Sequence, residues 1–346
     1  MKNKLLIVLG IIIAIIIAFG AYIGMSLRPV SKSSSETPFT IKGGMSKIQI
    51  AKELKKQGLV RSDLATLAYM FFTPNLNLQA GDYTIDKAKS TPAIIKQIGN
   101  GEIDEIIPTV KITFKDGKRF IDYAEQISEN FDIQYDDIIK KGSDPDFLKQ
   151  IINDYSFIDE SILNEKIYYP LEGYLAPDTY EFYKTADIET ILRKMLNSMD
   201  VKLKSMEADF KNSKYSTHGI LTIASIIEWE GKSSEDRAKV SQVIYKRLEM
   251  GMPLGMDVTT HYGARKGLKD PITAEDLASV NPYNTRNNNY LGLPVGSICN
   301  PSLDSINAAL HPSDTSYVYF IADKDGKLYF TETAEEFLQL KKQFGL

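Results

Sequence analysis

Gly219-Ile-Leu-Thr-Ile-Ala-Ser-Ile-Ile-Glu-Trp-Glu-Gly231 combines a long apolar run with two acids and is the starting point for interpreting this chain. The apolar residues from 220 to 227 predict a helix that is buried on most of its surface. The run ends in Glu228, Trp229 (the only tryptophan) and Glu230. An apolar wall beside Glu228 would disfavour its charged form and raise its pKa, as a proton donor at neutral pH requires.

The two acids differ in direction. Glu228 and Glu230 are two residues apart, which is about 200° around a helix, so only one of them can face a given pocket. A solvated acid at a helix end, without any chemistry, is the alternative explanation for Glu228. The rest of the chain has to decide between them.

Composition limits the classes of function. The chain has 346 residues, 43% hydrophobic and 25% charged, as expected for about two globular domains beyond any anchor. The net charge is -4 and no basic stretch is interleaved with aromatic residues, so no nucleic-acid partner is expected. The single Cys299 excludes an intramolecular disulfide, and the three histidines are spaced too far apart to suggest a zinc site. We predict neither a metal nor a cofactor.

The N-terminus predicts a membrane anchor. Residues 5–25 form an uncharged, apolar run that is long enough to cross a bilayer. A signal peptide is the alternative, but the run exceeds a typical signal core and no clear cleavage site follows it. We therefore expect a retained single-pass anchor in the cell membrane, with residues 1–4 in the cytoplasm and the body outside. Residues 26–38 are rich in Ser and Pro and predict a linker.

Two segments share a strand, a glycine turn and a helix. The first runs from Phe39 through Gly44 to a helix that starts at Ser46, and the second covers residues 110–130. Placing Gly44 on Gly117 also aligns Ala51 with Ala124 and Leu54 with Ile127. This unit resembles the start of a LysM-like module, a small fold often associated with glycan binding, although two similar units without a ligand are an equal alternative. We predict an α+β protein with a LysM-like α/β subdomain over 39–108. A mixed α+β catalytic domain over 109–346 would contain the second unit.

Several loops and helices complete the second domain. Residues 169–180 predict an ordered loop with several aromatic rings and Glu172, which suits sugar binding or simple packing. A helix is expected over 188–210 and another from Ser233 to Gly251, where Arg237 and Arg247 lie near one face. Residues 254–262 read as a β-prone stretch that carries polar groups. A hairpin over 317–331 and a closing helix from 332 end the chain.

Together these segments resemble the endolytic murein transglycosylases, the MltG or YceG-like family, over essentially the whole chain. The segments that carry the resemblance are Leu171-Glu-Gly-Tyr174 with Pro177-Asp-Thr-Tyr180, Leu221 to Glu230, Arg247-Leu248 with Gly251-Met252, Asp257-x-Thr259, Tyr283-Asn-Thr285, Gly292-Leu-Pro-x-Gly296, Asn300-Pro301, Ala308-Ala309 and Tyr317-x-Tyr-Phe320.

The resemblance implies a membrane-anchored lyase that cuts nascent peptidoglycan strands between N-acetylmuramic acid and N-acetylglucosamine. Its products would carry 1,6-anhydro ends and would terminate strand elongation. The family's catalytic acid falls on Glu228. Peptidoglycan synthases and division or elongation proteins are the implied partners. The residues expected to bind substrate or to support the site are Glu172, Tyr180, Glu230, Asp257, Thr259, Tyr283 and Asn284.

This chemistry needs only one acid, which protonates the leaving oxygen and then accepts the proton of the attacking C6 hydroxyl. A muramidase, which hydrolyses the same bond, and a non-catalytic glycan-binding scaffold are the alternatives. The chain also departs from the family. Trp229 replaces a usual Lys, Arg286 a usual Tyr and Glu336 a usual His, and Gly255-Met256 replaces Gln and a small polar residue. These departures put the contacts near residues 255 and 336 in doubt.

Overall fold

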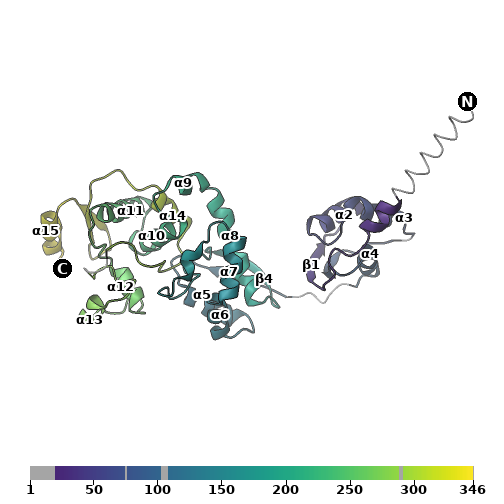
Figure 1. Ribbon diagram of the computed structural model, residues 1–346, viewed down its shortest axis with the longest axis horizontal. Helices are drawn as coiled ribbons and strands as arrows, with labels where there is room; N and C mark the ends of the chain where they lie inside the picture. Colours follow the sequence, from purple (N-terminus) through teal and green to yellow (C-terminus); the bar gives the residue numbers. More distant parts are fainter. Residues whose placement is uncertain (1–19, 75, 103–107, 288–290, 346) are drawn as a thin grey trace, which may run out of the picture. The chain divides into compact units, whose positions relative to one another are not determined.

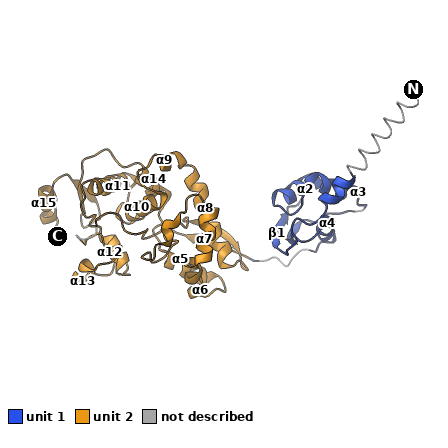
Figure 2. Ribbon diagram, in the orientation of Figure 1, with its two compact units in different colours: residues 1–108 blue, residues 109–346 orange. Residues whose placement is uncertain are grey.

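The computed structural model describes residues 20–74, 76–102, 108–287 and 291–345. The chain divides into two compact units, residues 1–108 and 109–346 (Figure 2). Helices and small antiparallel sheets alternate along the chain, which confirms the α+β class (Figure 1).

The first unit has a β-α-α-β-α order. β1 (Glu36–Ile41) pairs antiparallel with β2 (Gly81–Asp86), and α2 (Lys47–Lys56) and α3 (Asp63–Phe72) lie between them in sequence, with α4 (Thr91–Asn100) following. Ser46 caps α2 through a capping box, as the sequence predicts. The alternating residues of the strands and the inner faces of the helices form one core, which includes Phe39, Leu54, Tyr83, Ile94 and Ile98.

The predicted linker over 26–38 is not a free spacer. The amide of Thr91 donates to the carbonyl of Leu27 over 3.0 Å, and Arg61 Nε donates to the carbonyl of Pro29 over 2.8 Å. Further along, Asp86 accepts hydrogen bonds from Ser34 and Ser35, and β1 begins at Glu36. The Ser-rich composition predicted flexibility, but these hydroxyls and amides find partners on the first unit.

Most of the predicted membrane span lies outside the described residues. Residues 20–26, its last part, are helical. Within the part of the chain that the structure describes, no helix combines the length and the apolar character needed to cross a bilayer.

The second unit begins with a two-stranded sheet whose strands are separated in sequence by several helices. β3 (Thr109–Phe114) pairs antiparallel with β4 (Asp178–Tyr183), and α5, α6, α7 and the short 3-10 helix η1 lie between them in sequence. Their bounds are Phe120–Asn130, Tyr135–Gly142, Pro145–Asp154 and Glu160–Leu163. Ala51 and Leu54 of the first unit and Ala124 and Ile127 of the second are all buried, so the two strand-turn-helix segments use equivalent core positions.

The centre of the second unit is α10 (Thr217–Glu230), which packs against α11 (Ser234–Glu249) and α14 (Leu303–Leu310) (Figure 1). All residues from Ile220 to Ile227 are buried, which confirms the predicted apolar helix. The predicted helix over 188–210 is interrupted at Ser205 and Met206, which divide it into α8 (Ile188–Lys204) and α9 (Glu207–Asn212).

The remaining elements surround this centre. Residues 254–262 do not form a strand, because they contain the short helix α12 (Asp257–Gly263) instead. An acid in the first turn of a helix is favourable, and burial of every residue from Val258 to Gly263 outweighs the β-propensity of Val and Thr. α13 (Ala274–Ala278) follows. The predicted hairpin and closing helix are confirmed as β5 (Tyr319–Ala322), β6 (Leu328–Thr331) and α15 (Ala334–Phe344).

Candidate active site

Two acids at the end of α10 occupy different environments. α10 starts at the Ser216 cap and ends at Gly231, whose amide donates to the carbonyl of Ile227 over 2.8 Å. A Cβ on Gly231 would lie 2.7 Å from Cγ of Arg237, so glycine is needed for α11 to approach this closely. The glycine turn thereby brings Arg237 to the end of α10.

Glu228 is held from two sides. Arg237 Nη2 donates to Glu228 Oε1 over 3.2 Å, and the amide and hydroxyl of Ser302 donate to Oε2 over 2.9 Å and 2.5 Å. Ser302 is the N-cap of α14, so this carboxylate lies at a helix N-terminus. Its side chain is only 7% exposed. The apolar wall predicted beside Glu228 exists, but the carboxyl group itself contacts one cation and two hydrogen-bond donors.

Trp229 has a structural role that the sequence left unexplained. Its ring Nε1 donates to the carbonyl of Gly117 over 2.8 Å. Gly117 has a left-handed φ of 67°; its amide donates to the carbonyl of Asn300, and the amide of Asn300 donates to the carbonyl of Lys118. A Cβ on Gly117 would lie 3.6 Å from Cγ of Glu228. The Gly117 turn therefore covers Glu228 and encloses it.

Glu230 has none of these contacts. Within residues 20–74, 76–102, 108–287 and 291–345, its carboxylate has no hydrogen-bond or ion-pair partner, and the residue is half-buried. Burial raises the pKa of Glu230 to about 7; the charge of Asp257 raises it further and that of Arg286 lowers it. A carboxyl group that exchanges its proton near neutral pH and retains some access to solvent fits a general acid and base.

Asp257 and Arg286 form an ion pair, and both lie close enough to Glu230 for their charges to change its pKa. Asp257 is the first residue of α12, and both side chains are well exposed, at 56% and 41%. The structure thus brings together Glu230 and Asp257 of the predicted set, and it adds Arg286, which the sequence identified only as a departure from the family.

The other predicted site residues are buried in the framework. Glu172 is 3% exposed and accepts hydrogen bonds from the amide of Phe120 over 2.8 Å and the hydroxyl of Tyr262 over 3.1 Å. Burial raises the pKa of Glu172 to about 8, against the lowering effect of these two donors. Tyr180 donates to the carbonyl of Ala176 over 2.7 Å, and burial raises its pKa to about 12. Neither side chain is open to a substrate in this structure.

Thr259, Tyr283 and Asn284 are likewise fully buried. Thr259 shares a hydrogen bond of 2.8 Å with the hydroxyl of Thr285, and the hydroxyl of Tyr283 accepts one of 3.2 Å from the amide of Tyr168. Asn284 Nδ2 donates to three backbone carbonyls between residues 276 and 279. These residues fix the segment from 276 to 286 and therefore position Arg286.

Sequence reasoning only partly anticipated the residues around Glu228. It placed Arg237 and Arg247 near one face of a helix, and of these two Arg237 contacts Glu228. Arg247 instead donates to the carbonyls of Val318 and Leu254. Ser302 was missed, although a Ser before an apolar helix is a recognisable cap signal. What the sequence lacked was the long-range contact, since Ser302 is 74 residues from Glu228.

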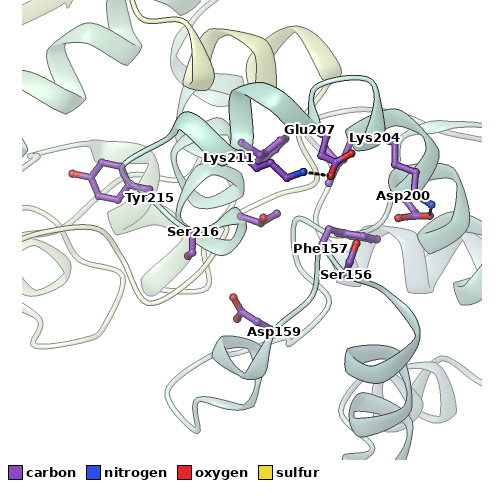
Figure 3. Close-up of a pocket in the computed structure, with 12 residues that line it drawn as sticks. Ser156, Phe157, Asp159, Asp200, Lys204, Glu207, Lys211, Tyr215 and Ser216 are labelled. Atoms are coloured by element: carbon purple, nitrogen blue, oxygen red, sulfur yellow. Dashed lines mark hydrogen bonds and ion pairs between the residues drawn. The ribbon is translucent and has the colours of Figure 1, made fainter.

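A separate cavity of about 500 Å³ lies at the other end of α10 (Figure 3). Four of its five charged side chains form ion pairs, Lys204 with Asp200 over 2.5 Å and Lys211 with Glu207 over 2.6 Å, and Asp159 is the fifth. It includes Thr217, the first residue of α10, and the rise of a helix puts this end about 20 Å from the acids. Among the described residues, no group of three His, Cys, Asp or Glu side chains is placed to hold a metal ion.

The fold and this site define an α+β protein whose central buried helix ends in two carboxyl groups, one bound by Arg237 and Ser302 and one without a partner among the described residues. The model of the YceG-like family matches residues 39–343, and the chain belongs to that family.

Curated relatives carry one name. An "Endolytic murein transglycosylase" of Bacillus subtilis (strain 168) is 34% identical over 321 residues, which cover 92% of this chain and 88% of the relative. A protein of the same name from Streptococcus pneumoniae serotype 2 (strain D39) is 30% identical over 341 residues. This chain spans 62% of the length of the pneumococcal relative.

Among solved structures, the chain is similar to a yceG-like protein from Listeria monocytogenes, with a TM-score of 0.64 and 32% identity. The match covers 89% of this chain and all of the other.

Proposed function

We propose that this protein is a lytic transglycosylase that cuts peptidoglycan glycan strands internally, between N-acetylmuramic acid and N-acetylglucosamine. The shared name of the curated relatives and the family assignment support the activity and the substrate class. The products would carry 1,6-anhydro-muramic ends, and their formation on nascent strands would terminate elongation.

Glu230, in place of Glu228, is the proposed proton donor and acceptor. The observation that carries this assignment is the contrast between the two carboxyl groups. Both residues are partly buried, but Glu228 is bound by Arg237 and Ser302, whereas Glu230 has a pKa raised to about 7 and is without a partner among the described residues. A proton shuttle has to exchange its proton during the reaction, and a carboxyl group with a pKa near 7 and no competing partner among the described residues is suited to this at neutral pH.

The proposed reaction uses one carboxyl group twice. Glu230 first protonates the glycosidic oxygen as the bond to C1 of the muramic residue breaks. The carboxylate then accepts the proton of the C6 hydroxyl while that oxygen bonds to C1, which closes the anhydro ring and returns Glu230 to its starting state. No water is consumed, and an attacking group within the same sugar needs no separate binding site.

The experiment is product analysis on uncrosslinked glycan strands in water enriched in ¹⁸O. Anhydro ends that are lighter by one water and free of ¹⁸O are expected. The Glu230→Gln variant should lose the activity and the Glu228→Gln variant should retain it. Reducing ends that contain ¹⁸O would contradict the transglycosylase mechanism.

A muramidase is the second candidate, because Asp257 supplies a second carboxylate in the electrostatic range of Glu230. Two carboxyl groups are what a hydrolase needs to activate water. Asp257 is paired with Arg286, however, which opposes its use as a base. The ¹⁸O experiment separates the two candidates. A non-catalytic scaffold is the remaining alternative, and strand binding without turnover by the wild-type chain would support it.

For the rest of the chain, we propose a LysM-like subdomain over 39–108 that contacts glycan, with a second such unit near 110–130. The β1-α2-α3-β2 order with antiparallel strands supports the first assignment. We also propose that residues 5–25 anchor the chain once in the cell membrane, with the body outside the cytoplasm. Peptidoglycan synthases and division or elongation proteins are the proposed partners.

A further inference from the structure

The outer face of α3 is apolar along its whole length. Leu64, Leu67, Ala68, Phe71 and Phe72 follow the i, i+3, i+4, i+7, i+8 spacing of one helix face. Leu64, Phe71 and Phe72 are 54%, 65% and 89% exposed, and α3 contains no charged residue after Asp63. A surface helix of a soluble domain normally carries polar residues on this side. We call these five residues the α3 face.

The opposite side of α3 already packs into the first unit. Ala65, Thr66 and Met70 are buried there, so the helix is apolar all round but covered on one side only. Contiguous exposed apolar surface of this kind marks a contact with another molecule or with lipid.

The α3 face lies close to the end of the proposed membrane anchor. The hydroxyl of Tyr22, on the helical segment 20–26, is 3.4 Å from the hydroxyl of Ser62, the N-cap of α3. Tyr22 and Met25 are themselves 49% and 64% exposed. Because residues 27–35 are hydrogen-bonded onto the first unit, this unit follows the anchor directly, without a flexible spacer.

Charge in the first unit also favours a phospholipid surface. Residues 20–102 contain eleven Lys and Arg against six Asp and Glu, a net charge of +5 in a chain whose overall charge is -4. Lys47 Nζ lies 5.8 Å from the ring centre of Phe71, and Arg61 precedes α3. Basic side chains beside exposed aromatic rings are typical of segments that lie in the interface of an anionic bilayer.

From these observations we propose that the α3 face inserts into the outer leaflet of an anionic phospholipid bilayer and holds the first unit against the membrane. The proposal assumes the membrane location given under Proposed function but not the anchor itself. Such a contact would fix the orientation of the first unit at the membrane surface, which a single span followed by a flexible linker would not do.

The test uses the full chain in vesicles of phosphatidylglycerol and phosphatidylethanolamine. The only native cysteine, Cys299, is fully buried, so a cysteine introduced at the surface can be labelled selectively with the fluorophore NBD. Phe72→Cys places the probe on the α3 face. Thr40→Cys is the matched control in the same unit, because Thr40 is exposed on β1, away from α3 (Figure 1).

The probe at position 72 is expected to emit at shorter wavelength and to be quenched several-fold more by nitroxide-labelled lipid than the probe at position 40. It should also be protected from aqueous iodide. Equal quenching at both positions would overturn the proposal. Protection from iodide that grows with protein density, without quenching by lipid, would overturn it in favour of contact with a second copy.

Carbonate extraction of the same vesicles tests the anchor independently. A chain that resists extraction while position 72 stays in water would retain the anchor and refute the α3 contact. A chain that is extracted by carbonate but whose position 72 is quenched by lipid beforehand would refute the anchor and support the α3 contact.

Discussion

Replacing each of the two acids of α10 by glutamine should separate stability from activity. Glu228→Gln removes the charge that faces Arg237, whose side chain is 16% exposed. Removing one partner of a buried ion pair typically costs 3–5 kcal/mol. The cost here should be about 2–3 kcal/mol, because Arg237 keeps its ion pair with Asp304 and the glutamine oxygen can still accept from Ser302. For a domain of this size that corresponds to a melting temperature about 5–10 °C lower.

Glu230→Gln should do the opposite. Its carboxylate has no partner to lose among the described residues, so the melting temperature should change little at pH 5 and should rise near and above pH 7, where the variant no longer buries a charge. Loss of a general acid and base should lower turnover by a factor of about 10²–10⁴.

Stability should also respond to pH through Glu230. Its pKa is about 7 in the folded chain and 4.5 in the reference state, so the folded chain binds more protons than the unfolded chain between these values. The free energy of unfolding therefore falls as pH rises from about 4.5 to 7. Glu230→Gln should remove this contribution and make the dependence less steep, while the raised pKa of Glu172, about 8, keeps part of the slope in every variant that retains it.

The assay pairs thermal unfolding by circular dichroism, from pH 5 to 8, with initial rates of anhydro-end formation below the melting temperature of each variant. Turnover within about tenfold of wild type is expected for Glu228→Gln, since it retains the proton shuttle. An inactive Glu228→Gln with unchanged melting temperature, together with an active Glu230→Gln, would refute the reasoning and return the catalytic role to Glu228.

The charges around Glu230 should set the pH at which the enzyme loses its acid. Asp257→Asn should shift the fall of kcat/KM at high pH to lower pH, and Arg286→Gln should shift it to higher pH, as pH–rate profiles would show; coincident profiles would contradict the assignment. Glu172→Ala should destabilise the second unit by roughly 3 kcal/mol in urea unfolding, because buried donors lose their acceptor. Glu172→Gln should retain turnover, and its loss with an intact fold would restore Glu172 to the site. Gly117→Ala should cost about 1–2 kcal/mol in the same measurement, from its left-handed φ alone, because the added Cβ meets only ordinary contacts; no loss would contradict this account.

The elements that the sequence predicted correctly depend on neighbouring residues. The cap at Ser46, the cap at Ser233 and the buried run from 220 to 227 are each determined within about one or two helical turns. The stretch over 254–262 was predicted wrongly because Val and Thr favour strands locally. The stretch forms a helix because its residues are buried against distant parts of the chain, as in the hydrogen bond from Tyr262 to Glu172.

The surroundings of the predicted site residues could not be read from the sequence for a related reason. Thr259, Tyr283 and Asn284 belong to motifs of the family, and motif membership does not distinguish a side chain that meets substrate from one that holds a loop. Here their hydroxyl and amide groups are saturated by other protein groups in the interior. Of the residues predicted to support the site, Asp257 lies close enough for its charge to raise the pKa of Glu230.

By itself, the sequence determined that a buried helix delivers two acids, facing opposite ways, to the edge of an apolar core. Helical periodicity and burial of apolar surface act over a few residues, so this much is readable from one segment. The tertiary structure decided the surroundings of each acid, on which the proposal for Glu230 rests. These surroundings depend on Ser302, 74 residues along the chain, and on Asp257 and Arg286, because hydrogen bonds and charges act through space and not along the sequence.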